Sequence, residues 1–210
     1  MTHIINDRFL KQFAILLCAF ILCATSVRAE TEPFTGAPQL FGHKEVVHRG
    51  TAAFTKWVAS NQSQARAAQT EQTREWKSFL ATLRGQGRRE QIEAVNHYMN
   101  KIAYIADKQN YGVDDYWATI EEFMTRGGDC EDYALAKYRS LMQLGFSANE
   151  LRLVILYDQD KRINHAVLAV MLDGKWKILD NQVQNVRDDD EISNYKPIYA
   201  ISQNSWWRFI

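Results

Sequence analysis

The chain has 210 residues, of which 46% are hydrophobic and 12% aromatic, a composition that fits one globular domain and excludes a disordered or collagen-like chain. Its formal net charge is zero. This balance gives no electrostatic reason to expect nucleic acid or an anionic membrane surface as a partner.

The first 29 residues have the order of a secretory signal peptide. Arg8 and Lys11 precede an apolar run over residues 13–24, and small residues then lead to Ala29. A membrane-spanning helix needs about 20 apolar residues, so the shorter run favours a cleaved leader over an uncleaved membrane anchor. We expect a single mature domain of residues 30–210. Its formal charge is −2, because the leader carries three basic side chains and one acidic one.

Export would leave Cys130 as the lone cysteine, because Cys18 and Cys23 lie within the leader. A single thiol in an oxidising compartment cannot form an internal disulfide, so it is either buried or chemically useful. Free cysteine is among the most buried residue types, and the neighbours of Cys130 must decide between the two readings.

The first part of the mature chain, about residues 51–145, is predicted to be helical after a Pro- and Gly-containing lead-in over residues 30–50. Apolar side chains with helical spacing, or helix-favouring composition, mark four segments. These are 51–84, 88–107, 116–124 and a helix that begins near Cys130 and is ended by Gly145.

The second part, about residues 150–205, is predicted to form strands. The expected strands are 151–157, 163–172, 175–179 and 195–201, and the acidic run 188–191 is expected to be a solvated loop. Helices followed by strands indicate an α+β domain in which helices pack on an antiparallel sheet.

Cys130 is predicted to lie at a helix start, with Asp129 as N-cap. The helix dipole and its unpaired N–H groups there stabilise a thiolate and can bind an oxyanion. Gly127 and Gly128 would let a substrate backbone approach closely. Against this, the carboxylates of Asp129, Glu131 and Asp132 would raise the pKa of the thiol.

A cysteine nucleophile needs a base and a group that orients the base. If residues 173–174 form a two-residue hairpin turn, Leu172 faces Lys175, and counting back along both strands places Asp180 diagonally beside His165. Taken alone, His165 could be a core histidine and Asp180 an acid at a strand end, without a catalytic role. Together with Cys130 they indicate a papain-type Cys-His-Asp triad.

Three segments resemble the bacterial transglutaminase-like cysteine proteinases, and among them the LapG-type periplasmic proteases. They are GGDCEDYA at 127–134, NHAVL at 164–168 and LDNQ at 179–182. The resemblance implies a papain/transglutaminase-like core, with Cys130 as nucleophile, His165 as base and Asp180 as orienting acid. It also implies a periplasmic endopeptidase that cleaves the N-terminal region of a large surface adhesin, which disperses biofilm.

The resemblance further implies dependence on Ca²⁺ held by Asp129 and Glu131, with Asp132 less certain, and sequestration by an inner-membrane cyclic-dinucleotide receptor. Hard oxygen donors suit Ca²⁺, and a dication would offset the charge beside the thiolate. From the residues alone, the favoured interpretation is that these acids cap the helix and favour its dipole, and the resemblance reverses it for Asp129 and Glu131.

Three other functions stay open at this point, one of which is a structural envelope protein whose buried Cys130 thiol would resist iodoacetamide. An acyl transferase of the transglutaminase or amidase type shares the chemistry up to the thioester. A non-enzymatic, calcium-responsive binding module would keep its full effect without the thiol of Cys130.

Overall fold

The computed structural model describes residues 38–67 and 69–210. The expected signal peptide, residues 1–29, and the first part of the expected lead-in lie outside the described residues. Within the described part of the chain, no helix combines the length and the apolar character that crossing a membrane requires.

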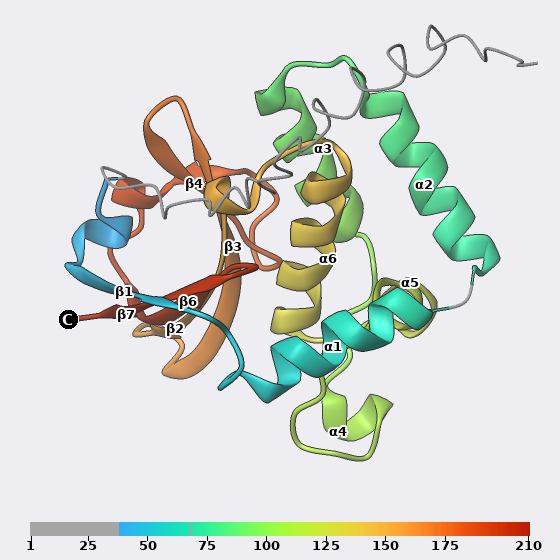
Figure 1. Ribbon diagram of the computed structural model, residues 1–210, viewed down its shortest axis with the longest axis horizontal. Coiled ribbons are helices and arrows are strands. Elements are labelled where there is room, and N and C mark those ends of the chain that lie inside the picture. The colour runs from blue at the N-terminus through green and yellow to red at the C-terminus, as the bar shows by residue number, and fades with distance from the viewer. Residues whose placement is uncertain (1–37, 68) are drawn as a thin grey trace, which may run out of the picture. The chain divides into compact units, whose positions relative to one another are not determined.

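Helices precede most of the strands, as the sequence predicts (Figure 1). The α-helices are α1 (Thr55–Arg66), α2 (Glu71–Leu83), α3 (Arg88–Met99), α4 (Asp107–Asn110), α5 (Ile120–Arg126) and α6 (Cys130–Gln143). The strands are β1 (Glu45–Arg49), β2 (Leu151–Asp158), β3 (Ile163–Leu172), β4 (Lys175–Leu179), β5 (Arg187–Asp188), β6 (Tyr195–Ile201) and β7 (Ser205–Phe209). Short 3-10 turns cover Leu40–Gly42, Ala148–Glu150 and Asp189–Glu191.

The strands form one antiparallel sheet in the order β1-β7-β6-β2-β3-β4-β5. The predicted hairpin register is confirmed over the paired residues, with Leu172 opposite Lys175 and Leu168 opposite Leu179. Asp173 and Gly174 at the turn both have positive φ, of 52° and 76°, which two-residue hairpin turns of this kind require. The register determines which side chains stand beside His165.

Helix α6 packs against β2 and β3 and lies between the sheet and the helices α1 and α2 (Figure 1). Alternate residues of β2 and β3 point to each face of the sheet. Leu153 and Leu168 belong to the cluster on the α6 side, whereas Val154 and Val167 belong to the cluster on the opposite face.

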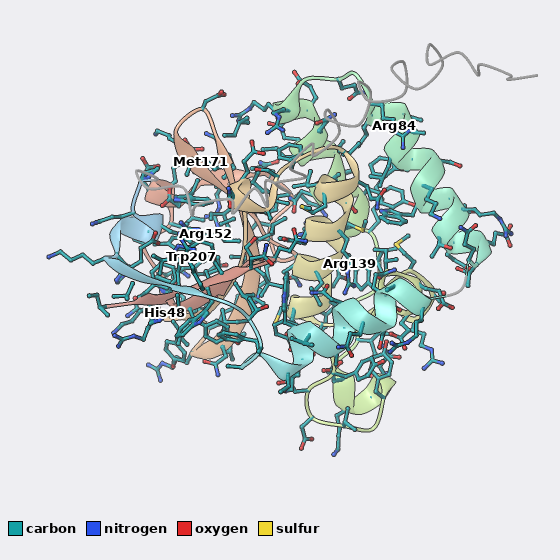
Figure 2. The ribbon with its side chains drawn as sticks, in the orientation of Figure 1. His48, Arg84, Arg139, Arg152, Met171 and Trp207 are labelled. Atoms are coloured by element: carbon teal, nitrogen blue, oxygen red, sulfur yellow. The ribbon has the colours of Figure 1, made fainter. Side chains whose placement is uncertain are left out.

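The face of the sheet away from α6 encloses a buried arginine, Arg152 of β2 (Figure 2). Its guanidinium carbon lies 4.0 Å from the centroid of the Trp207 ring and 4.4 Å from that of Trp176. Its Nη1 donates to Oε2 of Glu45 at 2.6 Å. A strand from the start of the described chain is thereby fixed to the sheet by a cation between two rings.

Three of the four predicted helical segments have different bounds. The segment 51–84 forms two helices, α1 and α2. The segment 88–107 is helical only to Met99, and the C-cap Asn100 donates through its side chain to the carbonyl oxygen of Asp180 at 2.8 Å. The segment 116–124 becomes α5, which starts at Ile120 because Thr119 and Glu122 form a capping box. A side-chain hydrogen bond lies at each of these helix ends, local at α5 and long-range at α3, and the apolar periodicity predicts neither.

Two predicted irregular segments are ordered differently. The lead-in contributes β1 to the sheet edge, and part of the expected acidic loop is β5 followed by a 3-10 turn in which Asp189 is buried. Asp189 accepts from the backbone N–H of Phe41 at 2.6 Å, so this acid joins two distant segments.

Candidate active site

Cys130 is the first residue of α6, as its Asp129 N-cap predicts. The preceding glycines have a structural reason that differs from the expected one. A Cβ on Gly127 would lie 2.3 Å from the carbonyl oxygen of Ala103, and one on Gly128 would lie 2.2 Å from Oδ2 of Asp132. Glycine is therefore needed at both positions because the backbone of Ala103 and the carboxylate of Asp132 approach too closely for a Cβ. This explanation requires no substrate.

His165 and Asp180 form a buried pair. Nε2 of His165 lies 2.9 Å from Oδ1 of Asp180, and each side chain is 2% exposed or less. Asp180 follows the last residue of β4, one position beyond the paired register. Although burial acts to raise it, the hydrogen bond and charge of His165 lower the pKa of Asp180 to about 2. Asp180 is therefore an anion hydrogen-bonded to the imidazole.

The sulfur of Cys130 lies against the backbone of β3. The backbone N–H of Ala166, the residue after His165, donates to this sulfur. Asp180 contacts Nε2, so the other ring nitrogen, Nδ1, is not engaged by this acid. In the described part of the chain, Nδ1 contacts Nε2 of Gln182 at 3.4 Å, and the thiol donates to Oε2 of Glu131 at 3.0 Å.

Carboxylates gather around Cys130 from three parts of the chain. Among the described residues, Asp129, Cys130 and Glu131 have potential ligand atoms within 4.8 Å of one another. Glu131 forms a second such group with Asp107 and Asp115, which lie at the two ends of the segment containing α4. Sequence reasoning missed Asp107 and Asp115, since their distance along the chain from Cys130 carries no spacing signal.

The clustered charge perturbs the titration of this site. Burial, followed by the charges of Glu131 and Asp132, raises the pKa of Asp129 to about 9. Burial and the Glu131 carboxylate raise the pKa of the Cys130 thiol well above its usual range. Without a cation, these acids therefore favour the protonated thiol. They oppose the helix start, which favours the thiolate, as the sequence indicates.

Asp132 has a clear structural role. Its Oδ1 accepts from the backbone N–H of Ala118 at 2.7 Å, and its Oδ2 accepts from that of Asp129 at 3.3 Å. Burial is the main cause that raises its pKa to about 8. Both oxygens are thus used in fixing the segment before α5 to the start of α6.

The acid cluster has the donors that a hard cation binds. Oδ1 of Asp129 and Oδ1 of Asp107 are buried and have no hydrogen-bond partner among the described residues. Leaving a buried carboxylate oxygen unsatisfied is unfavourable, and Ca²⁺ takes carboxylate oxygens as ligands. The residues present therefore fit a calcium ion, with Asp129 and Glu131 as predicted ligands and Asp107 and Asp115 as additional donors.

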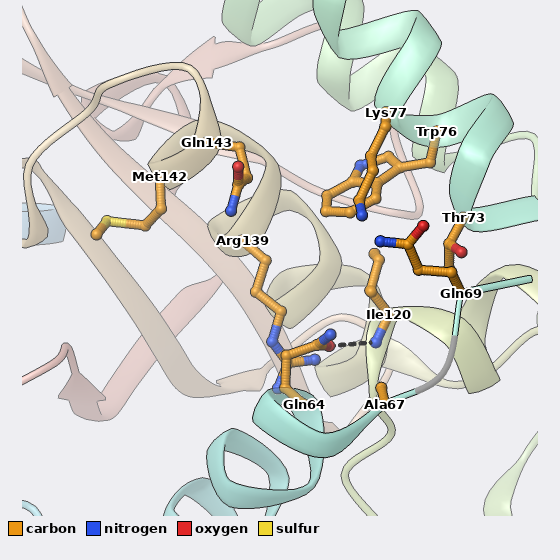
Figure 3. Close-up of a pocket in the computed structure, with 10 residues that line it drawn as sticks. All are labelled: Gln64, Ala67, Gln69, Thr73, Trp76, Lys77, Ile120, Arg139, Met142 and Gln143. Carbon is orange, nitrogen blue, oxygen red and sulfur yellow. Dashed lines mark hydrogen bonds between the residues drawn. The ribbon is translucent and has the colours of Figure 1, made fainter.

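A separate pocket of about 350 Å³ lies between α1, α2, α5 and α6 (Figure 3). Gln64 closes one side, where its Oε1 accepts from the backbone N–H of Ile120 at 2.7 Å. The pocket is lined by Gln64, Ala67, Gln69, Thr73, Trp76, Lys77, Ile120, Arg139, Met142 and Gln143. This lining contains no thiol, imidazole or carboxylate, so it supplies none of the groups of cysteine-protease chemistry.

Solved structures of LapG from Legionella pneumophila are similar to this chain at 27% identity. One has a TM-score of 0.60 and covers 70% of this chain and 84% of LapG. The calcium-bound form has a TM-score of 0.58, with coverage of 67% and 81%. The EGTA-treated form has a TM-score of 0.57, with coverage of 67% and 78%. The predicted α+β fold with a transglutaminase-like core is confirmed.

A search of curated proteins found no match. The family model described as bacterial transglutaminase-like cysteine proteinase BTLCP matches residues 48–209, which include Cys130, His165 and Asp180. That match spans most of the chain. The chain belongs to the family of bacterial transglutaminase-like cysteine proteinases.

Proposed function

We propose that this protein is a calcium-dependent periplasmic cysteine endopeptidase, which cleaves the N-terminal region of a large surface adhesin and so promotes biofilm dispersal. The observation that carries the proposal is the buried His165–Asp180 pair at 2.9 Å, together with a cysteine at a helix start whose sulfur accepts from the backbone N–H of Ala166, the residue after His165. Family membership supports peptide-bond cleavage as the reaction.

In this proposal, Nδ1 of His165 removes the proton of Cys130, and the thiolate attacks the scissile carbonyl carbon. The backbone N–H of Cys130 has no acceptor within the helix by its position, so it can donate to the oxyanion. His165 then gives its proton to the leaving amine as the thioester forms, and water hydrolyses the thioester. Asp180 stabilises the imidazolium throughout.

Calcium would be held by Asp129 and Glu131, with Asp107 and Asp115 as further oxygen donors. A bound dication supplies positive charge that offsets the carboxylates beside the thiol. Glu131 now accepts the proton of the Cys130 thiol, and engaging this carboxylate elsewhere frees the thiol for His165. The calcium-bound form of the Legionella relative supports this part of the proposal.

The periplasmic location, the adhesin substrate and sequestration by an inner-membrane cyclic-dinucleotide receptor rest on the signal-peptide pattern and the family resemblance. The adhesin substrate is tested by mixing the purified protein with the N-terminal region of the largest adhesin of the same cell. We expect one cut, which requires Cys130 and stops when EGTA is added. The periplasmic location is tested by cell fractionation, in which the periplasmic fraction should contain the protein with its leader removed.

The same assay separates the alternatives when a primary amine is added. An endopeptidase gives two fragments with unmodified new ends, whereas an acyl transferase attaches the amine, which mass spectrometry detects. A binding module without catalysis predicts that Cys130→Ala retains full biological effect. His165→Gln should abolish cleavage, whereas His97→Gln, on the exposed face of α3, is the matched control and should not.

A further inference from the structure

Tyr195, the first residue of β6, contacts the acid of the His165–Asp180 pair. Its hydroxyl donates to Oδ2 of Asp180 at 2.6 Å, and its side chain is 5% exposed. The other oxygen, Oδ1, accepts from Nε2 of His165 and from the backbone N–H of Gln182, each at 2.9 Å. Each oxygen of this buried carboxylate therefore has its own donors.

The sheet brings Tyr195 to this position. Leu156 of β2 pairs with His165 on one side and with Pro197 on the other. Tyr195 lies two residues before Pro197 and therefore on the same face of the sheet. Its ring meets the His165 imidazole edge-on, with centroids 5.9 Å apart and an interplanar angle of 66°.

The side chain of Asp180 needs such a contact, because Asp180 lies beyond the paired end of β4. Its backbone carbonyl is held by Asn100, but this bond leaves rotation of the carboxyl group free. The donors on Oδ1 and Oδ2 are what fix that rotation. The Tyr195 hydroxyl is the donor on Oδ2 in the described structure.

We propose that Tyr195 is a positioning residue of this site, whose hydroxyl holds Oδ2 of Asp180 so that Oδ1 faces Nε2 of His165. This contact keeps the Nε2–H form of the imidazole and leaves the Nδ1 lone pair for the thiol of Cys130. The effect of this contact on catalysis rests on the proposed function. Its effect on the tautomer of His165 does not.

The test compares Tyr195→Phe with Tyr138→Phe in protein carrying ¹⁵N-labelled histidine. Tyr138→Phe removes another buried phenol hydroxyl, which bonds Ser202 at 3.3 Å, and serves as the matched control. Ring nitrogen shifts report the tautomer of His165. We expect Tyr195→Phe to turn the Nε2–H signal into a mixture of tautomers and to lower kcat about 10- to 100-fold with KM unchanged. Tyr138→Phe should change neither.

An unchanged His165 signal and kcat in folded Tyr195→Phe would overturn the proposal. If the unsubstituted protein cleaves no adhesin, the proposed function fails, and the histidine spectrum still decides the role of Tyr195. If Tyr195→Phe does not fold, 3-fluorotyrosine placed at position 195 gives a stronger hydroxyl donor in the same shape. It must then shift the His165 signal, and an unmoved signal would refute the positioning role.

Discussion

Lys137 of α6 is a fully buried lysine whose Nζ has no hydrogen-bond partner within residues 38–67 and 69–210, and replacing it should stabilise the protein. Burial lowers the pKa of Lys137 from 10.5 to about 7, although the charge of Asp180 acts in the opposite direction. Each pKa unit corresponds to about 1.4 kcal/mol. At pH 7 the unfolded lysine is fully charged, so burying it costs on the order of 4 kcal/mol.

Lys137→Met keeps the length of the side chain and removes the charge. We expect the variant to be more stable by about 4 kcal/mol at pH 7, which for a chain of this size corresponds to a rise in Tm of about 8–16 °C. Between pH 7 and 10.5 the Lys137 amine binds more protons in the unfolded state than in the folded state. The free energy of unfolding of the unsubstituted protein therefore rises with pH through this group. The advantage of Lys137→Met should therefore shrink to about 1.4 kcal/mol near pH 9.5.

Urea unfolding at pH 7 and pH 9.5, followed by circular dichroism, measures both quantities. The control is Lys77→Met on the exposed face of α2, which should change stability by less than about 0.5 kcal/mol. A Lys137→Met variant that is less stable than the unsubstituted protein, or whose advantage is the same at both pH values, would refute this reasoning.

Two further changes in stability follow from charges in the structure. In EGTA, stability should fall as the pH rises from about 4 to 8, because the folded pKa values of Asp129 and Asp132 are raised to about 9 and about 8 and the folded state retains their protons. Calcium at a hundred times its Kd should raise the free energy of unfolding by about 2.7 kcal/mol at pH 8. Calorimetry that gives equal Tm values with and without calcium would contradict this. Glu45→Ala leaves Arg152 buried without its carboxylate and should cost about 3 kcal/mol in urea unfolding. Glu93→Ala breaks only an exposed helical pair and should cost less than about 1 kcal/mol, so equal losses in the two variants would be the unexpected outcome.

The positions of His165 and Asp180 could be predicted because a two-residue turn fixes the register of a hairpin. Once residues 173–174 form the turn, every pair along β3 and β4 follows, and the structure keeps that register up to the end of β4. The start of α6 was equally predictable, since Asp129 is a good N-cap. Local rules suffice where the geometry is local.

Asp107, Asp115 and Tyr195 could not be placed in this way. Their proximity to the site depends on how the segment around α4 packs near the start of α6, and on β6 pairing with β2. Neither arrangement leaves a periodic signal in the chain. The bond from Asn100, the C-cap of α3, to Asp180 was missed for a related reason, because it joins residues far apart in sequence.

The rate of adhesin cleavage as a function of free calcium tests the central claim most directly. The unsubstituted protein, Cys130→Ser and Glu131→Gln would be compared over a calcium series buffered with EGTA, with calcium binding measured on the same samples by calorimetry. We predict no cleavage in EGTA, recovery at the calcium concentration that half-fills the site, a higher calcium requirement in Glu131→Gln and no cleavage at any concentration by Cys130→Ser. Undiminished cleavage after thorough chelation, or cleavage by Cys130→Ser, would contradict the account.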